Sequence, residues 1–429
     1  MHKHFIVASA IFLLSACKTQ EKTYHANLND VADEYVKLTL AIGQYNSDFI
    51  DSYYGPEDWQ PKGKPSEHLP YEEFKWQANT LINQLKEIDD AAFGQLEMQR
   101  YGFLMKQLHA VQTKLDMMAG KQYPFDVESL ALYDATAEHA DLSKFDSLIQ
   151  QLESLVPGEG PLADRYIAYS RKFDIPADKL DTVFRTAIAE ARARTVNKLP
   201  LPENESIEIL YVNDKPWTSF SKYIGNARSE IHMNTDLPIS VDKALFFASH
   251  EVYPGHHVYS VMLDQNLVIE RNWSEYQVLP LFTPQLLIAE GTANYGFEMI
   301  FTMEDRISFE QEVLFPLAGI SNQSAETFCH IQELKKKLEH ADIAIARGYL
   351  NRSLSAEEAM DALKKYLLYS QREAQQRLAF YDEYGSYVIN YTLGEQMVKA
   401  HINETSSSVE EQWQLFYELL STPYTASAL

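Results

Sequence analysis

The spacing of apolar residues in the N-terminal part of the chain restricts the fold more than any other feature. Steps of alternately four and three residues place side chains on one face of an α-helix, because a helical turn takes about 3.6 residues. Three stretches keep this step and predict long amphipathic helices, each with one buried face. They are Val31, Tyr35, Leu38, Ile42, Tyr45 and Phe49; Phe74, Ala78, Leu81, Leu85 and Ile88; and Leu104, Leu108, Val111, Leu115 and Met118.

The pattern changes in the middle of the chain. A helix predicted from about Ala177 to Val196 ends before two prolines, and three short segments rich in β-branched and aromatic residues follow it. Helical spacing then returns, and Ser355 and Glu358 form a capping-box pattern. The sequence therefore predicts a mainly α fold with a small antiparallel β-sheet. Its strands are expected over 206–213, 217–224 and 228–235, and later helices over 241–249, 286–301 and 325–349.

Length and composition limit the class of protein. The 429 residues, 45% of them hydrophobic with 26 Tyr and 21 Phe, suffice for one large domain or two closely packed ones. A formal net charge of -24 argues against a nucleic-acid partner, because phosphate contacts need clustered Lys and Arg. We expect a helical half over 24–200 and a second half over 201–429 that carries the sheet and the candidate site, packed as one body.

The first residues, MHKHFIVASAIFLLSACKTQ, predict export. The apolar run is too short for a membrane-spanning helix, which takes about 20 residues, and small residues precede Cys17. The pattern resembles the bacterial lipobox: a signal peptide over 1–16, then a lipid-bearing Cys17 on a tether over 17–23. An ordinary signal peptide that contains a cysteine is the alternative. Lys18 favours the outer membrane, with the body of the protein facing the periplasm.

A group of histidines follows the predicted sheet, in the segment FFASHEVYPGHHVYS. His250 is followed by Glu251, and His256 and His257 come after a Pro-Gly step. A helical zinc motif places its second histidine four positions after the first, on the same face, whereas six or seven positions separate these. Pro254 has no amide hydrogen for the carbonyl four residues back, and glycine adopts angles that other residues avoid. A widened turn could therefore return a histidine to the first one, so a metal site and a histidine-rich loop both remain open.

A third ligand is available in the segment LLIAEGTANYGFEM. Glu290 follows an apolar run on a predicted helix, where a buried carboxylate is costly unless a positive partner meets it. Zinc would be that partner, and Asn294, one turn along the same face, would orient a ligating histidine. The alternative for Glu290 is an ordinary solvated carboxylate.

Three segments together resemble a known bacterial family. HEVYPGHH, the downstream EGTANYGFE and the C-terminal YGSYVINYTLGEQM are similar to bacterial domain-of-unknown-function family 885, many of whose members are candidate lipoproteins. The likeness covers most of the mature chain. It implies a large helical fold of the gluzincin type, in which two histidines and a downstream glutamate hold zinc. It therefore implies a zinc hydrolase, and first of all a metallopeptidase.

The resemblance also implies a role for individual residues. The zinc ligands would be His250, His256 and Glu290. Glu251 would be the general base. His256 is preferred to His257 because dipeptidyl peptidase III, a related precedent, also has a stretched zinc motif with Gly-His at its end. His257 would then support a ligand or contact substrate. Thr292 departs from the bulky Trp expected in this family, which leaves the substrate preference open.

Hydrolysis also needs a donor for the oxyanion and contacts for the substrate. Tyr387 and Tyr391, four residues apart, are either such donors or ordinary core tyrosines. The segment RSEIHMNT is expected as an edge strand that pairs with an extended peptide, with Arg228 near a substrate carboxylate and Asn234 bonded to its backbone. The alternatives to a peptidase are hydrolysis of another amide or ester, and peptide binding without turnover. Glu251 argues against the last, because a non-catalytic metal site needs no base.

Overall fold

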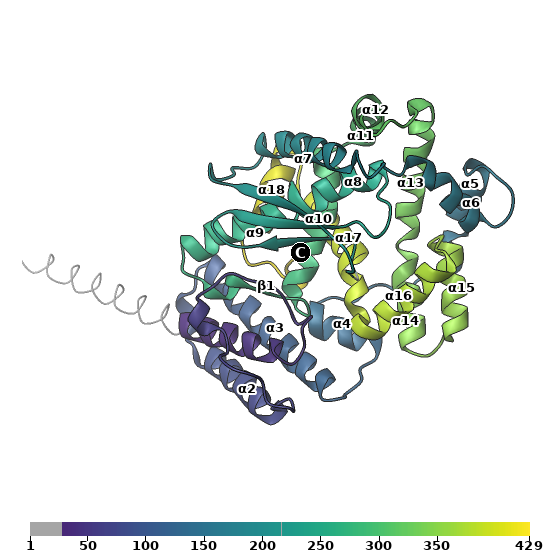
Figure 1. Ribbon diagram of the computed structural model, residues 1–429. Helices are drawn as coiled ribbons and strands as arrows, with labels where there is room; N and C mark the ends of the chain where they lie inside the picture. Colours follow the sequence, from purple (N-terminus) through teal and green to yellow (C-terminus); the bar gives the residue numbers. More distant parts are fainter. Residues whose placement is uncertain (1–27, 216) are drawn as a thin grey trace, which may run out of the picture.

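The computed structural model describes residues 28–215 and 217–429, so the predicted signal peptide, the tether and Cys17 lie outside the described residues. Helices dominate the molecule, and a small sheet lies beside them (Figure 1). The predicted mainly helical class, with a small sheet ahead of the histidine cluster, is confirmed. Within the described part of the chain, no helix is both long and apolar enough to cross a bilayer.

The N-terminal half is mainly helical, and the apolar faces of its helices contribute to one core. Two predicted stripes lie on α2 and α3, where Leu81, Leu104 and Leu108 are buried. The first helix is shorter than its stripe, because Phe49 already leads into a strand. The helices of this half are residues 28–43, α2 (Tyr71–Glu87), α3 (Gln95–Met118), α4 (Phe125–Tyr133), α5 (Asp146–Leu155), α6 (Leu162–Ser170) and α7 (Leu180–Val196).

A three-stranded sheet occupies the predicted positions, in the spatial order β2-β4-β3. Its strands are β2 (Ser206–Val212), β3 (Ser219–Tyr223) and β4 (Arg228–Asn234). The expected antiparallel pairing joins β3 and β4, whereas β2 runs parallel to β4, so the sheet is mixed. The expectation that 228–235 forms an edge is wrong. β4 is the central strand because its alternate residues Ser229, Ile231 and Met233 are buried in the core, and both of its edges are paired.

A second, two-stranded sheet links distant parts of the chain. β1 (Ile50–Tyr53) pairs antiparallel with β5 (Val278–Pro280), and the register shifts between Ile50 and Ser52. The buried side chains of Arg100 and Glu275 form an ion pair, with 2.6 Å between Nε and Oε1. Strand pairing and a buried ion pair therefore connect the N-terminal half to the C-terminal half.

Two helices of the C-terminal half cross with their backbones in direct contact. α10 (Pro284–Ile300) and α17 (Ile389–Thr405) meet at Gly291 and Gly394. A Cβ at Gly291 would lie 2.5 Å from the carbonyl oxygen of Gly394, and a Cβ at Gly394 would lie 2.7 Å from a backbone oxygen of α10. Only glycine permits this approach on both helices. The crossing brings the middle of α10, which carries Glu290, beside the start of α17.

The other helices of this half surround the crossing (Figure 1). The predicted capping box is confirmed: the Ser355 hydroxyl accepts from the Glu358 amide, and the Glu358 carboxylate accepts from the Ser355 amide. The helix predicted over 325–349 is divided in two. The bounds are α8 (Val241–Phe247), α9 (His256–Leu263), α11 (Met303–Phe309), α12 (Phe315–Ala318), α13 (Ala325–Leu338), α14 (Ala341–Leu350), α15 (Ala356–Tyr366), α16 (Gln371–Tyr384) and α18 (Val409–Ser421).

Candidate metal centre

The histidine segment lies on a deformed stretch between two helices. α8 continues as a π-helical turn, η5 (Ala248–Val252), which contains His250, and α9 then begins at His256. The amide of Gly255 donates to the carbonyl of Ser249, which lies six residues earlier rather than four (N···O 3.0 Å). The widened turn expected from the Pro-Gly step is therefore present, and it lies directly between the two histidines.

Gly255 makes this turn possible. A Cβ at this position would lie 1.8 Å from the carbonyl oxygen of His250 and 2.5 Å from its carbonyl carbon. Real side chains do not make contacts this short, so glycine is required where the chain folds back on His250. The preceding Pro254 packs against α10, where Gly296 leaves room for its ring: a Cβ there would lie 2.9 Å from Cγ of Pro254.

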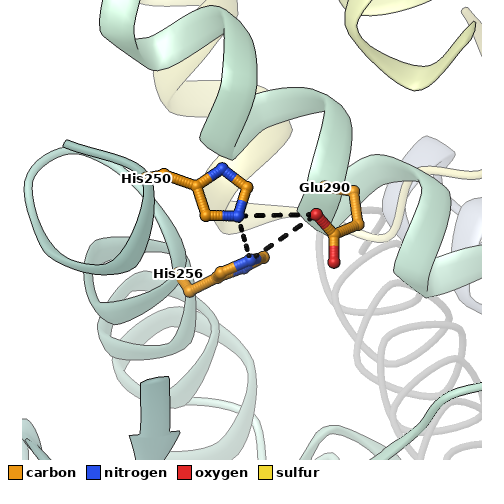
Figure 2. A group of neighbouring side chains, drawn as sticks. All are labelled: His250, His256 and Glu290. Atoms are coloured by element: carbon orange, nitrogen blue, oxygen red, sulfur yellow. Dashed lines mark hydrogen bonds and ion pairs between the residues drawn. The ribbon is translucent and has the colours of Figure 1, made fainter. Parts of the chain in front are cut away.

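The turn brings His250 and His256 together with Glu290 of α10, and Figure 2 shows the three side chains converging. The Nε2 atoms of His250 and His256 are 3.2 Å apart. Oε2 of Glu290 lies 3.6 Å from Nε2 of His250 and 3.8 Å from Nε2 of His256. The six-residue spacing is therefore compatible with a common site. These three residues are termed the metal-site cluster below.

Asn294 orients the first histidine. Its Nδ2 donates to the carbonyl of Tyr391 (3.2 Å), which turns Oδ1 towards His250, where it accepts from Nδ1 (2.9 Å). The hydrogen of His250 is therefore on Nδ1, and Nε2 presents a lone pair to the cluster. Asn294 lies one turn after Glu290 on α10, as expected for a residue that supports a ligand.

Burial keeps both imidazoles neutral. It lowers the pKa of His250 to about 4, and it lowers the pKa of His256 well below its usual value, with a further contribution from the neighbouring His250. Metals bind the neutral form of histidine, so these two side chains need to lose no proton at neutral pH.

Glu290 is buried with one oxygen unsatisfied. The residue is 6% exposed, and Oε1 accepts from the hydroxyl of Tyr387 at 3.3 Å. Oε2 faces both histidines and has no hydrogen-bond partner within the described part of the chain. Burial raises the pKa of Glu290 to about 8, and the charges of Glu251 and Asp51 add to the shift. A cation between Oε2 and the two Nε2 atoms would remove this cost, and two imidazole nitrogens with one carboxylate oxygen form a donor set that suits zinc.

Glu251 lies beside the cluster and is held by the sheet. It is 4% exposed, and its Oε1 accepts from the hydroxyl of Ser219 on β3 at 2.5 Å. Burial raises its pKa to about 7, against the opposing effect of hydrogen bonds from Ser219 and the Ser221 backbone. A carboxyl group that titrates near neutral pH can both accept and return a proton.

Tyr387 and Tyr391 lie together beside Glu290. Tyr387 is on the 3-10 turn η10 (Gly385–Val388), Tyr391 is in the first turn of α17, and their ring centroids are 5.6 Å apart. Burial is the main reason that the pKa of each phenol is raised, and the charge of Glu290 contributes. Both groups therefore remain protonated donors at neutral pH.

His257 belongs to a second cluster. It is fully buried, with Nε2 at 2.9 Å from Oε1 of Glu205 and Nδ1 at 2.7 Å from Oγ of Ser229. Glu205 also accepts from the hydroxyl of Tyr253 and forms an ion pair with Arg192 (Nη2···Oε2 3.0 Å). This Glu205 cluster holds residues on both sides of the Pro-Gly step. It corrects the expected substrate contact of His257, because neither ring nitrogen is free; His257 instead supports the turn.

The two substrate contacts expected on β4 are corrected as well. The amide group of Asn234 donates to the carbonyls of Lys215 and Trp217, at 3.0 and 2.9 Å, and so closes the loop between β2 and β3. Arg228 is exposed at the start of β4 and points away from the face that carries Ser229. Because both edges of β4 are paired, its backbone cannot add a peptide strand.

Three polar residues at or behind the site were missed from the sequence: Ser219, Glu205 and Asp51. Ser219 is brought to the site by the pairing of β3, and Glu205 directly precedes β2; no local pattern reports either position. Asp51 lies in the segment DSYYGPEDW, which reads as a break between helices and contains β1 instead. A charged residue within an aromatic, partly alternating segment was the available signal.

Comparison with known proteins yields distant structural likenesses. No family model and no curated protein matches the chain. A protein of unknown function from Shewanella oneidensis, described as a candidate lipoprotein, is 11% identical over 81% of this chain and 72% of that one, with a TM-score of 0.47. The M32 carboxypeptidase from Deinococcus radiodurans R1 is 12% identical over 94% of this chain and 90% of that one, with a TM-score of 0.34. Because these values are low, they assign no role to residues of this chain, and the resemblance to family 885 stays a prediction.

Proposed function

We propose that this protein is a zinc-dependent hydrolase, and more specifically a metallopeptidase that cleaves short peptides. The observation that carries the proposal is Oε2 of Glu290, which is buried against two neutral imidazoles and lacks a hydrogen-bond partner among the described residues. His250, His256 and Glu290 would hold one zinc ion per chain. When bound, zinc would supply Lewis acidity, which acidifies water and polarises a carbonyl group.

Glu251 is the proposed general base. It directly follows a ligand in the sequence, and Ser219 fixes one of its oxygens. Its carboxylate would accept a proton from the attacking water and pass it to the leaving amine. A buried glutamate with a pKa of about 7 suits this exchange better than an exposed one, whose pKa lies near 4.3.

The two tyrosines have different roles in this proposal. The hydroxyl of Tyr387 donates to Oε1 of Glu290 and so orients the ligand. Tyr391 lies beside it and is the proposed donor to the oxyanion that forms when water adds to the carbonyl. Replacing Tyr391 by Phe should therefore lower kcat with little effect on zinc content.

A peptide is favoured over other amides by the position of β3. β3 is an outer strand of the sheet, and its residues Ser219 and Ser221 both bond to Glu251. An extended peptide beside this strand would present its carbonyls close to the proposed base. A non-peptide amide or an ester remains the second candidate, because the same metal chemistry hydrolyses those bonds.

The deciding experiment uses chain lacking residues 1–17, with elemental analysis and digestion of a defined peptide mixture. We expect one zinc per chain in the wild type. Glu251→Gln should keep the metal and lose turnover by about 1,000-fold or more. Turnover of Glu251→Gln equal to that of the wild type would refute the proposed mechanism. Zinc binding without hydrolysis of peptides, amides or esters in the wild type would instead support a non-catalytic peptide-binding lipoprotein.

The proposed place of action is the periplasmic face of the outer membrane, with Cys17 as the lipid anchor. This part of the proposal rests on the sequence alone, because Cys17 lies outside the described residues. Metabolic labelling with a fatty acid tests it: Cys17→Ser should abolish incorporation of the label, and Cys329→Ser should not.

A further inference from the structure

A hollow of about 410 Å³ opens at the C-terminal end of α10, and no member of the metal-site cluster lines it. Its wall is formed by the end of α10, the start of α11, α13 and one residue of α17. Phe297 is part of this wall and follows Glu290 by seven residues, which is about 10 Å along a helix. The hollow is therefore separate from the candidate metal centre, and its volume lies in the range of small-molecule sites.

The wall of the hollow combines apolar side chains with positive charges. Its apolar part consists of Phe297, Phe301 and Met303. Its charged part has four cations and two acids: Arg306, Lys336, Lys337, Lys399, Glu298 and Glu333. The whole chain has a formal net charge of -24, so a wall in which cations outnumber acids runs against the overall charge. This balance favours an anionic ligand with an apolar part.

The three lysines of the wall already have acidic partners. Lys336 donates to Glu298 at 3.1 Å and to Glu395 at 2.6 Å. Lys399 donates to the other oxygen of Glu298 at 2.5 Å. Lys337 forms an ion pair at 3.6 Å with the glutamate one turn earlier on α13. These lysines therefore connect α10, α13 and α17 with one another and leave little positive charge for a ligand.

Arg306 differs from the lysines, because most of its hydrogen-bond donors are unused. The residue is 9% exposed, and the one hydrogen bond of its side chain within the described residues runs from Nη2 to the carbonyl of Cys329 at 3.4 Å. Nε is buried without a hydrogen-bond partner, and Nη1, which also lacks one, is not enclosed. Glu310 forms an ion pair with Nε at 3.5 Å but accepts no hydrogen bond from it. Unused donors on a buried side chain cost free energy, which an acceptor in the hollow would recover.

We propose that this hollow binds a small organic carboxylate, with the carboxylate group on Arg306 and the apolar part against Phe297 and Met303. The planar guanidinium group matches the two oxygens of a carboxylate. A ligand with one negative charge is favoured over inorganic phosphate, because only Arg306 lacks a hydrogen-bonded or closely paired acid on the wall and phosphate would leave the apolar side chains uncovered. The inference does not rest on the proposed hydrolase function.

The test uses 3-phenylpropionate, which joins one carboxylate to an apolar ring, and measures its binding to the full chain by calorimetry. The neutral 3-phenylpropionamide and inorganic phosphate are the comparison ligands. We expect one site per chain that binds 3-phenylpropionate at least about tenfold more tightly than either comparison ligand. Each titration is repeated with a chelator, because a carboxylate can also bind zinc, and the affinity should stay the same.

Two variants change different parts of the hollow. Arg306→Lys keeps the charge but loses the planar group, so the affinity for 3-phenylpropionate should fall about tenfold. Arg185→Lys, at an exposed ion-paired arginine of α7, is the matched control and should bind as the wild type does. Met303→Trp places a larger side chain in the hollow and should abolish binding, whereas Met98→Trp, at an exposed position of α3, should leave it unchanged.

Several results would overturn the inference. They are equal affinity for the acid and the amide, tighter binding of phosphate, loss of binding when the chelator is added, and no binding of 3-phenylpropionate at about 10 mM. Wild-type affinity in Arg306→Lys or in Met303→Trp would also overturn it. If circular dichroism shows that Arg306→Lys does not fold, Met303→Trp decides alone: lost binding supports the inference, and unchanged binding refutes it. Absence of zinc from the wild type would refute the proposed function and leave this inference in place.

Discussion

The metal-site cluster and the Glu205 cluster share one Pro-Gly step and the same residue types, but their carboxylates differ in how they are satisfied. His257, Tyr253 and Arg192 all donate to Glu205. These bonds outweigh the effect of burial and hold the pKa of Glu205 at about 2. Among the described residues, Glu290 receives a single hydrogen bond, from a tyrosine, and burial raises its pKa to about 8.

The difference separates a cluster that stabilises the fold from one prepared for a ligand. A buried carboxylate with a full set of donors is a stable part of the structure. A buried carboxylate that lacks them costs free energy, which the rest of the fold must offset until a cation arrives. Histidine beside glutamate is therefore not itself the mark of a metal site. The mark is an oxygen that the protein leaves without a partner.

The largest expected effect comes from breaking the turn that both clusters share. Gly255→Ala places a Cβ 1.8 Å from the carbonyl oxygen of His250, so the turn cannot form as it is. We expect a loss of about 3 kcal/mol or more in the free energy of unfolding, and loss of zinc binding. Urea denaturation and elemental analysis measure both. Gly102→Ala is the control: its Cβ meets no atom within 4 Å on α3, and helix propensity predicts a gain of about 0.5–1 kcal/mol. Wild-type zinc binding in Gly255→Ala would show that the turn is not what unites the histidines.

The second effect distinguishes the clusters directly. Glu290→Gln should weaken zinc binding on the order of 1,000-fold while leaving the metal-free protein as stable as the wild type or more so. Glu205→Gln should do the reverse, with a loss of about 2–4 kcal/mol in unfolding free energy and a smaller change in zinc affinity. Competition with a chromophoric chelator measures the zinc affinity, and urea denaturation of the metal-free proteins measures the free energy of unfolding. If zinc affinity and stability changed in the same way in both variants, the two clusters would not differ in their roles.

The pH dependence of zinc binding gives the third effect. The raised pKa of Glu290, about 8, means that zinc must displace a proton from this carboxyl at pH 6 and none well above pH 8. Zinc affinity should therefore rise about tenfold per pH unit from pH 6 to pH 8 and then level off. His250, with a pKa of about 4, is already neutral in this window and adds nothing. Glu251 titrates near pH 7 and adds to the slope, and Glu251→Gln isolates that share. If zinc affinity in Glu290→Gln still rose with pH as steeply as in the wild type, the proton displaced by zinc would come from another group.

The smallest effect tests the support of a single ligand. Asn294→Ala removes the acceptor that fixes the Nδ1 hydrogen of His250, so zinc affinity should fall about tenfold. Ser229→Ala removes the corresponding contact to His257 in the Glu205 cluster. It should cost about 1 kcal/mol in stability and leave zinc affinity close to that of the wild type. If Ser229→Ala weakens zinc binding as much as Asn294→Ala, the two clusters act as one unit.

Features that depend on local rules could be predicted from the sequence. Helical spacing placed α2, α3 and α7, and the Ser355 capping box was visible as a four-residue pattern. The convergence of His250 and His256 also follows from a local cause, because proline and glycine at 254 and 255 deform the helix between them. The choice of Glu290 followed from the cost of a carboxylate in an apolar run.

Features that depend on long-range pairing could not be predicted in this way. Buried and exposed residues alternate in the same way in a central strand and in an edge strand. The sequence of 228–235 therefore could not show that β2 pairs with β4. For the same reason Arg228 and Asn234 were assigned to the substrate. Glu205 and Ser219 come to the histidine segment from other elements, and only the tertiary fold reveals that they meet a partner there.

The glycine contact between α10 and α17 has a consequence for the order in which the molecule becomes competent. The imidazoles and Glu290 are present once the chain has been made to the end of α10, but both phenols, and the carbonyl that orients Asn294, arrive only with η10 and α17. A chain truncated before these elements would contain His250, His256 and Glu290 but lack the groups that orient them. Any activity of the proposed site would then be withheld until the segment from η10 onward has docked.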